Sequence, residues 1–234
     1  MHLNNISIIL VEPQNPGNIG SVARACKNLG ISNIILINPC DYLNDDAYKM
    51  GKNAKDWIHQ IIVHDRLEDC LDTHHILIGT TQRKRDKQVP YYTPSEIIST
   101  ASQWENNVRV GIVFGRENNG LTNTELSYCN YQSTIQANSE NSVFNLSQAV
   151  LIYAYECFNQ LNQETNPYKW DFATKKEEQL FYKNFESMLH TLPIDAHKGM
   201  SNFTQLFKRL FGRACLEKRD IRLFHKLIEL IKKK

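Results

Sequence analysis

The loop that follows an apolar run at residues 112–114 has residue types that suit a ligand-binding turn. The run, Ile-Val-Phe, is typical of a buried strand, and the polar residues and glycines behind it cannot continue one. Gly115 and Gly120 allow backbone angles that a side chain forbids, so a ligand can approach the main chain. A capping-box pattern at residues 122–125 then predicts a helix that reaches about Cys129. This order predicts a binding site at the carboxyl end of a sheet strand, although an ordinary strand-to-helix turn has a similar pattern.

Three consecutive cations follow a second predicted strand. The strand covers residues 75–79, and the polar segment after it, Thr-Thr-Gln-Arg-Lys-Arg, covers residues 80–85. Three cations in succession cannot belong to a core. They are therefore expected near solvent, where they can meet phosphates.

The segment at residues 12–20 also separates two predicted elements. A buried strand is predicted over residues 6–11, and a helix with one apolar face is predicted after Ser21, which we expect to be its N-cap. Arg24 projects from that helix away from the apolar face. The residues expected to exclude regular structure from the segment are Pro13, Pro16, Gly17 and Gly20.

Taken in order, the segments at residues 8–30, 111–121 and 138–155 resemble the three motifs of the SpoU (TrmH-like) class of the SPOUT RNA methyltransferases. The first contains V-E-P-Q-N-P-G-N-I-G-S-V-A-R, the second reads G-I-V-F-G-R-E-N-N-G-L, and the third begins N-S-E-N-S-V-F-N-L-S. The resemblance covers almost the whole chain, and the opening and tail are most similar to those of tRNA ribose methyltransferases. It implies a parallel-sheet α/β domain with a deep C-terminal trefoil knot.

The resemblance also implies transfer of a methyl group from S-adenosylmethionine to a ribose 2′-oxygen. This reaction chiefly requires alignment, because the sulfonium is already a strong leaving group. In the family, backbone groups in loops at the strand ends hold the cofactor. The matching positions in this chain are Thr80, Thr81, Gln82, Gly115, Ile135, Ser142, Val143 and Phe144.

Arg24 and Ser142 are the candidate catalytic residues. Arg24 matches a family arginine that is proposed to assist deprotonation of the 2′-hydroxyl. A guanidinium holds its proton far above neutral pH, so Arg24 could instead clamp a phosphate and stabilise the developing alkoxide. The third family motif usually reads S-S-L-N, whereas residues 142–145 read S-V-F-N. Val143 cannot form a side-chain hydrogen bond, so either the main chain makes the family's contact or Ser142 replaces the missing hydroxyl. By the same resemblance, the candidate RNA contacts are Arg83, Arg85 and Arg116.

Strands and helices alternate along the first two thirds of the chain, which argues for a mainly parallel α/β sheet. The apolar helix at residues 145–160 has almost no polar face, so both of its sides must be covered. One side is a candidate subunit interface, and the resemblance likewise implies a homodimer through the knot region that includes this helix. Further strands are predicted at 33–37, 61–63, 108–114 and 131–135, and further helices at 45–57 and 93–102.

The chain is predicted to contain a methyltransferase domain, a linker and a basic helical extension. These cover residues 1–160, 161–173 and 174–234. Three helices are predicted in the extension; the clearest has an apolar seam over residues 203–211 and is expected to stop at Gly212, and the last covers 221–231. Residues 1–168 carry 12 Lys and Arg against 17 Asp and Glu, whereas residues 169–234 carry 15 against 8. A basic extension on an acidic body favours contact with a polyanion.

The bulk composition excludes several other classes of protein. The 234 residues are 41% hydrophobic and 22% charged, which is typical of a globular protein, and no apolar run approaches the roughly 18 residues that a bilayer requires. Six scattered cysteines without a C-x-x-C pair and eight histidines without ligand spacing predict no metal site and no disulfide framework. We therefore expect a cytoplasmic protein that binds no membrane and no metal.

Two function classes remain in view. The first is a 2′-O-methyltransferase for tRNA, most readily for cytidine or uridine at position 32 of the anticodon loop, with ribosomal RNA as the alternative target. The second is a catalytically weakened RNA-binding protein with the same fold, because of the missing serine in the third motif.

Overall fold

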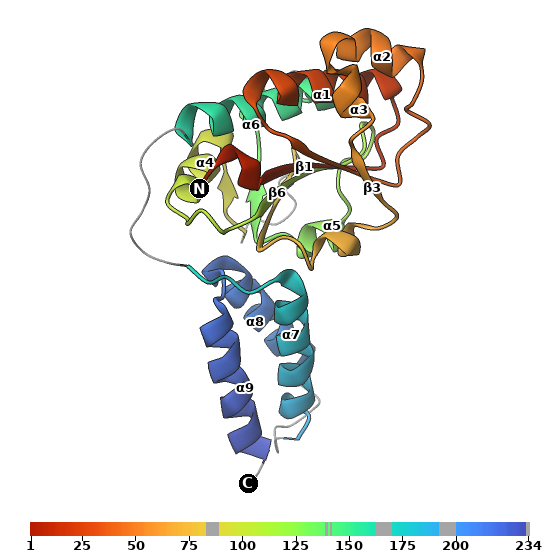
Figure 1. Ribbon diagram of the computed structural model, residues 1–234. Coiled ribbons are helices and arrows are strands. Elements are labelled where there is room, and N and C mark those ends of the chain that lie inside the picture. The colour runs from red at the N-terminus through yellow and green to blue at the C-terminus, as the bar shows by residue number, and fades with distance from the viewer. Residues whose placement is uncertain (83–88, 139, 141, 162–169, 192–199, 233–234) are drawn as a thin grey trace.

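The computed structural model describes residues 1–82, 89–138, 140, 142–161, 170–191 and 200–232. The body of the protein is a seven-stranded sheet in the order β3-β2-β1-β6-β4-β7-β5, in which every neighbouring pair is parallel (Figure 1). The predicted parallel α/β architecture is thereby confirmed. The strands are β1 (Ile6–Val11), β2 (Asn33–Ile37), β3 (Ile62–His64), β4 (Ile76–Thr80), β5 (Tyr91–Tyr92), β6 (Val110–Phe114) and β7 (Tyr131–Ser133).

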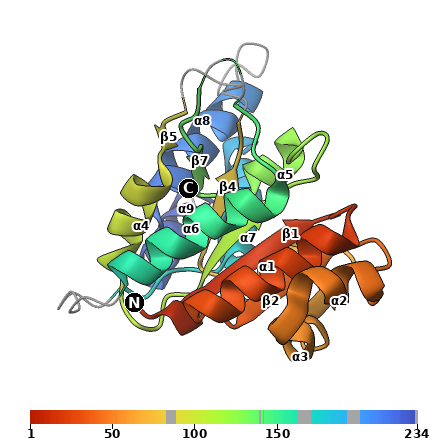
Figure 2. The same ribbon diagram turned by 90° about the horizontal axis from the view of Figure 1, so that it is seen from above.

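Helices and short 3₁₀ turns cover both faces of the sheet. Helices α1 and α6 lie side by side across one face, and α5 lies on the other (Figures 1 and 2). Because both faces are covered, β1 is buried along its whole length, as its mostly apolar sequence requires, and its one polar residue, Ser7, lies 2.9 Å from the His74 ring through its hydroxyl. The helices of the body are α1 (Pro16–Leu29), α2 (Asp45–Gly51), α3 (Lys55–Ile58), α4 (Pro94–Ser102), α5 (Asn123–Ser127) and α6 (Leu146–Gln160), with 3₁₀ turns η1 (Leu3–Asn5), η2 (Lys52–Ala54) and η3 (Leu67–Cys70).

Helix α1 begins earlier than the sequence predicted, so the expectation that Ser21 is its N-cap is wrong. Asn15 is the N-cap, and its side chain accepts hydrogen bonds from the backbone N–H groups of Gly17 and Asn18. Pro16 occupies the first helical position, where its fixed φ suits a helix and its missing N–H costs nothing. The proline that was expected to exclude a helix therefore starts one.

Three other expectations about element boundaries need correction. The single helix predicted over residues 45–57 is divided into α2, η2 and α3, because Lys52 adopts a positive φ of 47°. Gly212 does not end its helix, which continues to Ala214 and stops where Cys215 has a φ of 48°. Strand β5 was not predicted, since two tyrosines in a row carry no periodic signal.

The C-terminal extension contains the three predicted helices, α7 (Lys175–Leu189), α8 (Met200–Ala214) and α9 (Lys218–Lys232), around a small apolar core. Phe181 is fully buried there and contacts the rings of Phe211 and Phe224, at 5.5 and 5.1 Å between centroids. Part of the predicted linker packs against the rest of the protein. Phe172 is buried, stacks on Trp170 and forms a bridge with Glu217. The three domain boundaries stay a prediction.

Among the described helices, none combines the length and the apolar character that crossing a membrane requires.

Candidate active site

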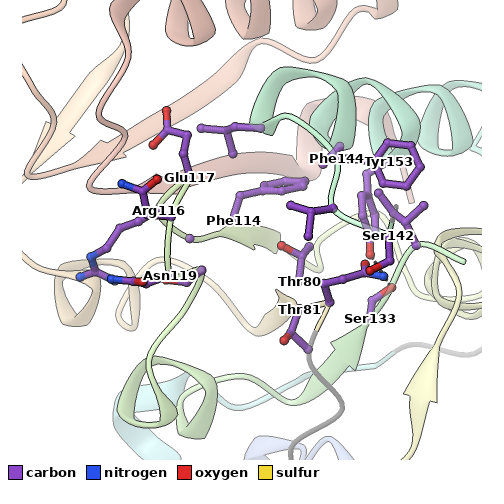
Figure 3. Close-up of a pocket in the computed structure, with 18 residues that line it drawn as sticks. Thr80, Thr81, Phe114, Arg116, Glu117, Asn119, Ser133, Ser142, Phe144 and Tyr153 are labelled. Carbon is purple, nitrogen blue, oxygen red and sulfur yellow. Dashed lines mark hydrogen bonds between the residues drawn. The ribbon is translucent and has the colours of Figure 1, made fainter. Parts of the chain in front are cut away.

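A cavity of about 400 Å³ lies at the carboxyl ends of β4, β6 and β7 (Figure 3). Volumes of about 300–1,000 Å³ are typical of small-molecule sites, and such sites lie outside the carboxyl ends of parallel strands. All eight residues that match the family's cofactor-binding positions line this cavity. The 18 lining residues are Thr80, Thr81, Gln82, Phe114, Gly115, Arg116, Glu117, Asn118, Asn119, Gly120, Ser133, Ile135, Ser142, Val143, Phe144, Leu146, Ala149 and Tyr153.

The loop after β6 folds back on itself so closely that it leaves no room for a side chain at its first position. A Cβ atom on Gly115 would lie 2.1 Å from the carbonyl carbon of Gly120. Gly120 has a left-handed φ of 66°, and its N–H donates to the Arg116 carbonyl at 2.9 Å. Gly115 and Gly120 both line the cavity, so the main chain of this tight loop forms part of its wall.

A chain of hydrogen bonds joins the three motif segments around the cavity. The Asn145 amide donates to Asn18 Oδ1 at 3.0 Å, and Asn18 Nδ2 donates to Glu117 Oε1 at 2.9 Å. The Glu117 carboxylate also accepts from the backbone N–H groups of Gln14 and Asn15, at 3.0 and 3.3 Å. Glu117 is thus occupied as a tie between loops, and we call this set the Glu117–Asn18–Asn145 chain.

Arg116 lines the cavity, but its guanidinium is held by two carboxylates. It donates to both oxygens of Glu12, at 2.6 and 2.8 Å, and to both oxygens of Glu125, at 3.0 and 3.1 Å. These hydrogen bonds raise the pKa of Arg116 and hold the pKa of Glu12 below its usual value. In Figure 3 the guanidinium points away from Ser142, Phe144 and Tyr153. The geometry therefore gives Arg116 a bracing role, and its contact with RNA stays a prediction.

The floor of the cavity contains a buried tyrosine that the sequence did not single out. Tyr153 donates its hydroxyl to Ser133 Oγ at 2.7 Å, and its ring meets Phe114 edge-on at 5.4 Å between centroids. Burial raises the pKa of the Tyr153 phenol, so it stays protonated. In the sequence Tyr153 is one of many apolar positions on a buried helix, and only its hydroxyl distinguished it.

The strand ends place threonine hydroxyl and amide groups at the rim. Thr80 Oγ1 donates to the Val113 carbonyl at 2.9 Å, and the Thr81 N–H donates to the Ser133 carbonyl at 2.9 Å. These two bonds fix the start of the segment that follows β4 against its neighbouring strands.

The candidate catalytic residues lie in different places. Ser142 is half-buried in the cavity wall, whereas Arg24 is exposed on α1 and is not among the lining residues. Next to Ser142, the side chains of Val143 and Phe144 are 78% and 37% exposed, so both extend to the mouth. The predicted RNA contacts Arg83 and Arg85 lie outside the described residues.

This arrangement suits binding and alignment rather than covalent catalysis. Among the lining residues that the structure describes, the titratable side chains are Arg116, Glu117 and Tyr153, and each is engaged in hydrogen bonds. Within the described ranges, no group of three or more His, Cys, Asp or Glu residues is placed to hold a metal ion.

Comparison with known proteins places this geometry in a family. The model of the SpoU rRNA Methylase family matches residues 5–155, which include all three motif segments. The tRNA (cytidine/uridine-2′-O-)-methyltransferase TrmJ of Pectobacterium atrosepticum is 34% identical over 242 residues, which cover 99% of this chain and 98% of the relative. The protein of the same name from Yersinia enterocolitica is 34% identical over 240 residues, with coverage of 99% and 93%.

Solved structures agree with the sequence comparison. The crystal structure of TrmJ from Z. mobilis ZM4 superposes with a TM-score of 0.78 at 27% identity, and covers 97% of this chain and 98% of that one. The likeness includes both the sheet and the helical extension, and the predicted resemblance is confirmed. This chain belongs to the SpoU methylase family.

Proposed function

We propose that this protein is a tRNA (cytidine/uridine-2′-O-)-methyltransferase that uses S-adenosylmethionine. The observation that carries the proposal is one cavity lined by the second and third motif segments, to which the Glu117–Asn18–Asn145 chain joins the first. The name shared by relatives that match along the full chain supports the substrate class.

The residues around the cavity fit this cofactor. The volume suits one small molecule, Phe114, Phe144 and Leu146 offer apolar surface, and the bare backbone at Gly115 offers main-chain hydrogen bonds. Thr80, Thr81, Gln82, Ile135, Ser142 and Val143 complete the set that would hold it. When bound, the cofactor supplies an electrophilic methyl group, and the protein supplies alignment and a site shielded from water.

The chain's own contribution at the reacting oxygen comes from Arg24 and Ser142. Arg24 is exposed, so it can reach a phosphate of bound RNA and stabilise the negative charge that develops on the ribose 2′-oxygen. Ser142 stands in the cavity wall beside Val143, and its hydroxyl can orient the ribose. The titratable groups of the lining are poorly suited to accept the proton of the ribose 2′-hydroxyl. Tyr153 stays protonated, and the carboxylate of Glu117 is engaged in hydrogen bonds with other protein groups.

The substrate is a tRNA, and the nucleotide we propose is cytidine or uridine 32 in the anticodon loop, in the cytoplasm. The basic extension would hold the RNA, and Arg83, Arg85 and Arg116 would contact its backbone near the acceptor. Ribosomal RNA as the target and a weakened RNA-binding protein are the alternatives, and methyl-transfer assays separate all three.

We further propose a homodimer through the knot region, with α6 at its centre. On the outer side of α6, Leu151, Tyr155 and Phe158 are 47%, 54% and 40% exposed, with only Gln148 and Asn159 as exposed polar neighbours on this helix. A second copy would cover this surface. The C-terminal trefoil knot that the resemblance implies belongs to the same proposal.

Replacing Arg24 tests the reaction. Purified protein, tritiated S-adenosylmethionine and undermethylated bulk tRNA are incubated, and the tRNA is digested to nucleosides. Label in 2′-O-methylcytidine or 2′-O-methyluridine is expected from the unaltered protein. Arg24→Ala should lower the rate about 100-fold, which is typical for loss of one charge-stabilising donor. Its affinity for S-adenosylhomocysteine should not change, because Arg24 lies outside the cavity lining.

The matched control is Arg66→Ala, which removes an exposed arginine that forms an ion pair with the nearby Glu68 at 3.1 Å. It should retain full transfer.

The assay also separates the alternatives. RNA retention without label would support the weakened binder, and label in ribosomal RNA alone would support the alternative target. Full transfer by Arg24→Ala would remove Arg24 from the reaction.

Replacing Gly115 tests the cofactor cavity. Gly115→Ala puts a methyl group where the backbone of Gly120 already lies, so the loop must open. Calorimetric titration with S-adenosylhomocysteine should show affinity lowered by about tenfold or more. Gly212→Ala is the control, because an added Cβ there meets nothing within 4 Å, and its affinity should equal that of the unaltered protein. Equal affinity for Gly115→Ala would place the cofactor elsewhere.

A charge on α6 tests the dimer. Leu151→Glu should shift sedimentation equilibrium from two chains per particle toward one, because a carboxylate would be buried without a partner in the interface. Leu223→Glu, at a similarly exposed leucine on α9, should leave the particle dimeric. A monomeric unaltered protein would contradict the proposed assembly.

A further inference from the structure

A second cavity, of about 320 Å³, lies between the body and the extension. Its walls come from α5, the start of β7, α7 and α8, and it is separate from the active-site cavity. Figure 1 shows the extension beneath the sheet on the side of α5, opposite α1 and α6. The volume is about ten times that of one water molecule, roughly 30 Å³, and lies at the lower end of the range for small ligands.

The wall of the second cavity contains a buried ion pair. Lys175 Nζ lies 2.8 Å from Glu178 Oε2, and the two residues are only 6% and 3% exposed. Burial raises the pKa of the Glu178 carboxyl, while Lys175 and the Asn130 amide oppose that rise. A buried carboxylate of this kind is stable only when hydrogen-bond donors surround it.

Two further polar groups in the same wall are shielded from solvent, Tyr182 Oη and Asn130 Nδ2. Tyr182 Oη has no hydrogen-bond partner in the described structure, and Asn130 Nδ2 lies near the Glu178 carboxylate without a bond of full hydrogen-bonding geometry. The orientation of the Asn130 side-chain amide is fixed, because Asn130 Oδ1 accepts a hydrogen bond from the Leu77 N–H at 2.9 Å. Enclosed polar groups without partners are rare in folded proteins, and beside a cavity a water molecule or a polar ligand can satisfy them.

The mouth of the second cavity is cationic. Lys208 and Arg213 line it and are exposed, and Lys208 Nζ lies 6.0 Å from the centre of the Tyr182 ring. The cavity therefore offers acceptors, donors and an aromatic ring inside, with positive charge at its entrance. A nucleotide has the complementary groups: a base edge with both donors and acceptors, a ring face, and a phosphate.

We propose that the second cavity binds one unstacked nucleotide of the RNA, with its base against Glu178, Asn130 and Tyr182 and its phosphate at Lys208. This inference rests on one part of the proposed function, namely that the protein binds RNA. The nucleotide differs from the methyl acceptor, because the two cavities lie on opposite faces of β7. Ser133 lines the active-site cavity and Gln132 lines the second one, and adjacent residues of a strand point to opposite faces. The RNA would pass around the β7–β5 edge of the sheet.

Removing one hydroxyl tests this site with little structural change. Tyr182→Phe deletes only an oxygen that has no partner in the described structure, so the melting temperature should be unchanged or slightly raised. The affinity for tRNA should fall about three- to tenfold, as for one lost hydrogen bond. The slope of affinity against salt should not change, because no charge is lost. Methyl transfer at saturating tRNA should keep its rate while KM for tRNA rises.

Lys208→Ala and Lys226→Ala form the matched pair of charge variants. Both remove a lysine from the extension, but only Lys208 lines the second cavity. Lys208→Ala should lower tRNA affinity and reduce the salt slope by about 1, and Lys226→Ala should do neither.

Three results would overturn the inference, and none depends on methyl transfer. The first is an unchanged tRNA affinity for Tyr182→Phe, and the second is an equal loss for Lys208→Ala and Lys226→Ala. The third is micromolar binding of a free nucleoside monophosphate that Tyr182→Phe weakens while tRNA affinity is unchanged, which would make the cavity a small-molecule site. If the variants lower tRNA affinity as predicted but the unaltered protein never methylates tRNA, the proposed function is wrong and the nucleotide site in the second cavity is still supported.

Discussion

The carboxylate of Glu117 is the constraint on which the active-site cavity depends. It accepts two backbone N–H groups from the loop before α1 and the side chain of Asn18, which in turn accepts from Asn145. The contacts lie in the loop after β6, at the first turn of α1 and at the N-cap of α6, where no strand ladder joins the three segments. The side chains of Glu117, Asn18 and Asn145 supply the hydrogen bonds that hold these segments together. A carboxylate that accepts several N–H groups is a strong acceptor, and partial burial strengthens each bond.

Arg116, the residue before Glu117, forms a second set of contacts between elements. Arg116 joins Glu12, at the end of β1, to Glu125, at the start of α5. Glu12 adopts a φ of 45°, an unfavourable value for a residue with a side chain, and its bidentate pair with Arg116 helps to hold it there. Glu117 and Arg116 are neighbours in the loop after β6. This one loop therefore holds the cavity wall through Glu117, and the end of β1 and the start of α5 through Arg116. The two charged side chains of the lining, Arg116 and Glu117, are thus engaged with other protein groups, and the rest of the lining is backbone and neutral side chains.

Much of the sheet followed from the sequence, because apolar runs followed by polar segments are local patterns and located β1, β4 and β6. The eight cofactor positions came from the family resemblance, and they lie at or after the ends of β4, β6 and β7. The start of α1 was misplaced because Pro16 suits both a loop and a first helical turn, and only the hydrogen bonds of Asn15 decide between them.

Contacts between distant residues left no local pattern. Tyr153 reaches Ser133 across the cavity floor, and the second cavity brings Asn130 against Glu178 and Tyr182 on a separate helix. Arg24 was named from the family motif, and its place outside the lining depends on how α1 packs on the sheet. Such relations come from tertiary packing, which periodicity and residue type do not encode.

A double-mutant cycle between Glu117 and Asn145, with calorimetric affinity for S-adenosylhomocysteine as the readout, tests the central claim most directly. Glu117→Ala, Asn145→Ala and the double variant are compared with the unaltered protein. If the chain through Asn18 holds the loops as one unit, the two losses will be non-additive by about 0.5–3 kcal/mol, and Asn18→Ala will abolish that coupling. Strictly additive losses, or no binding by the unaltered protein, would contradict the account.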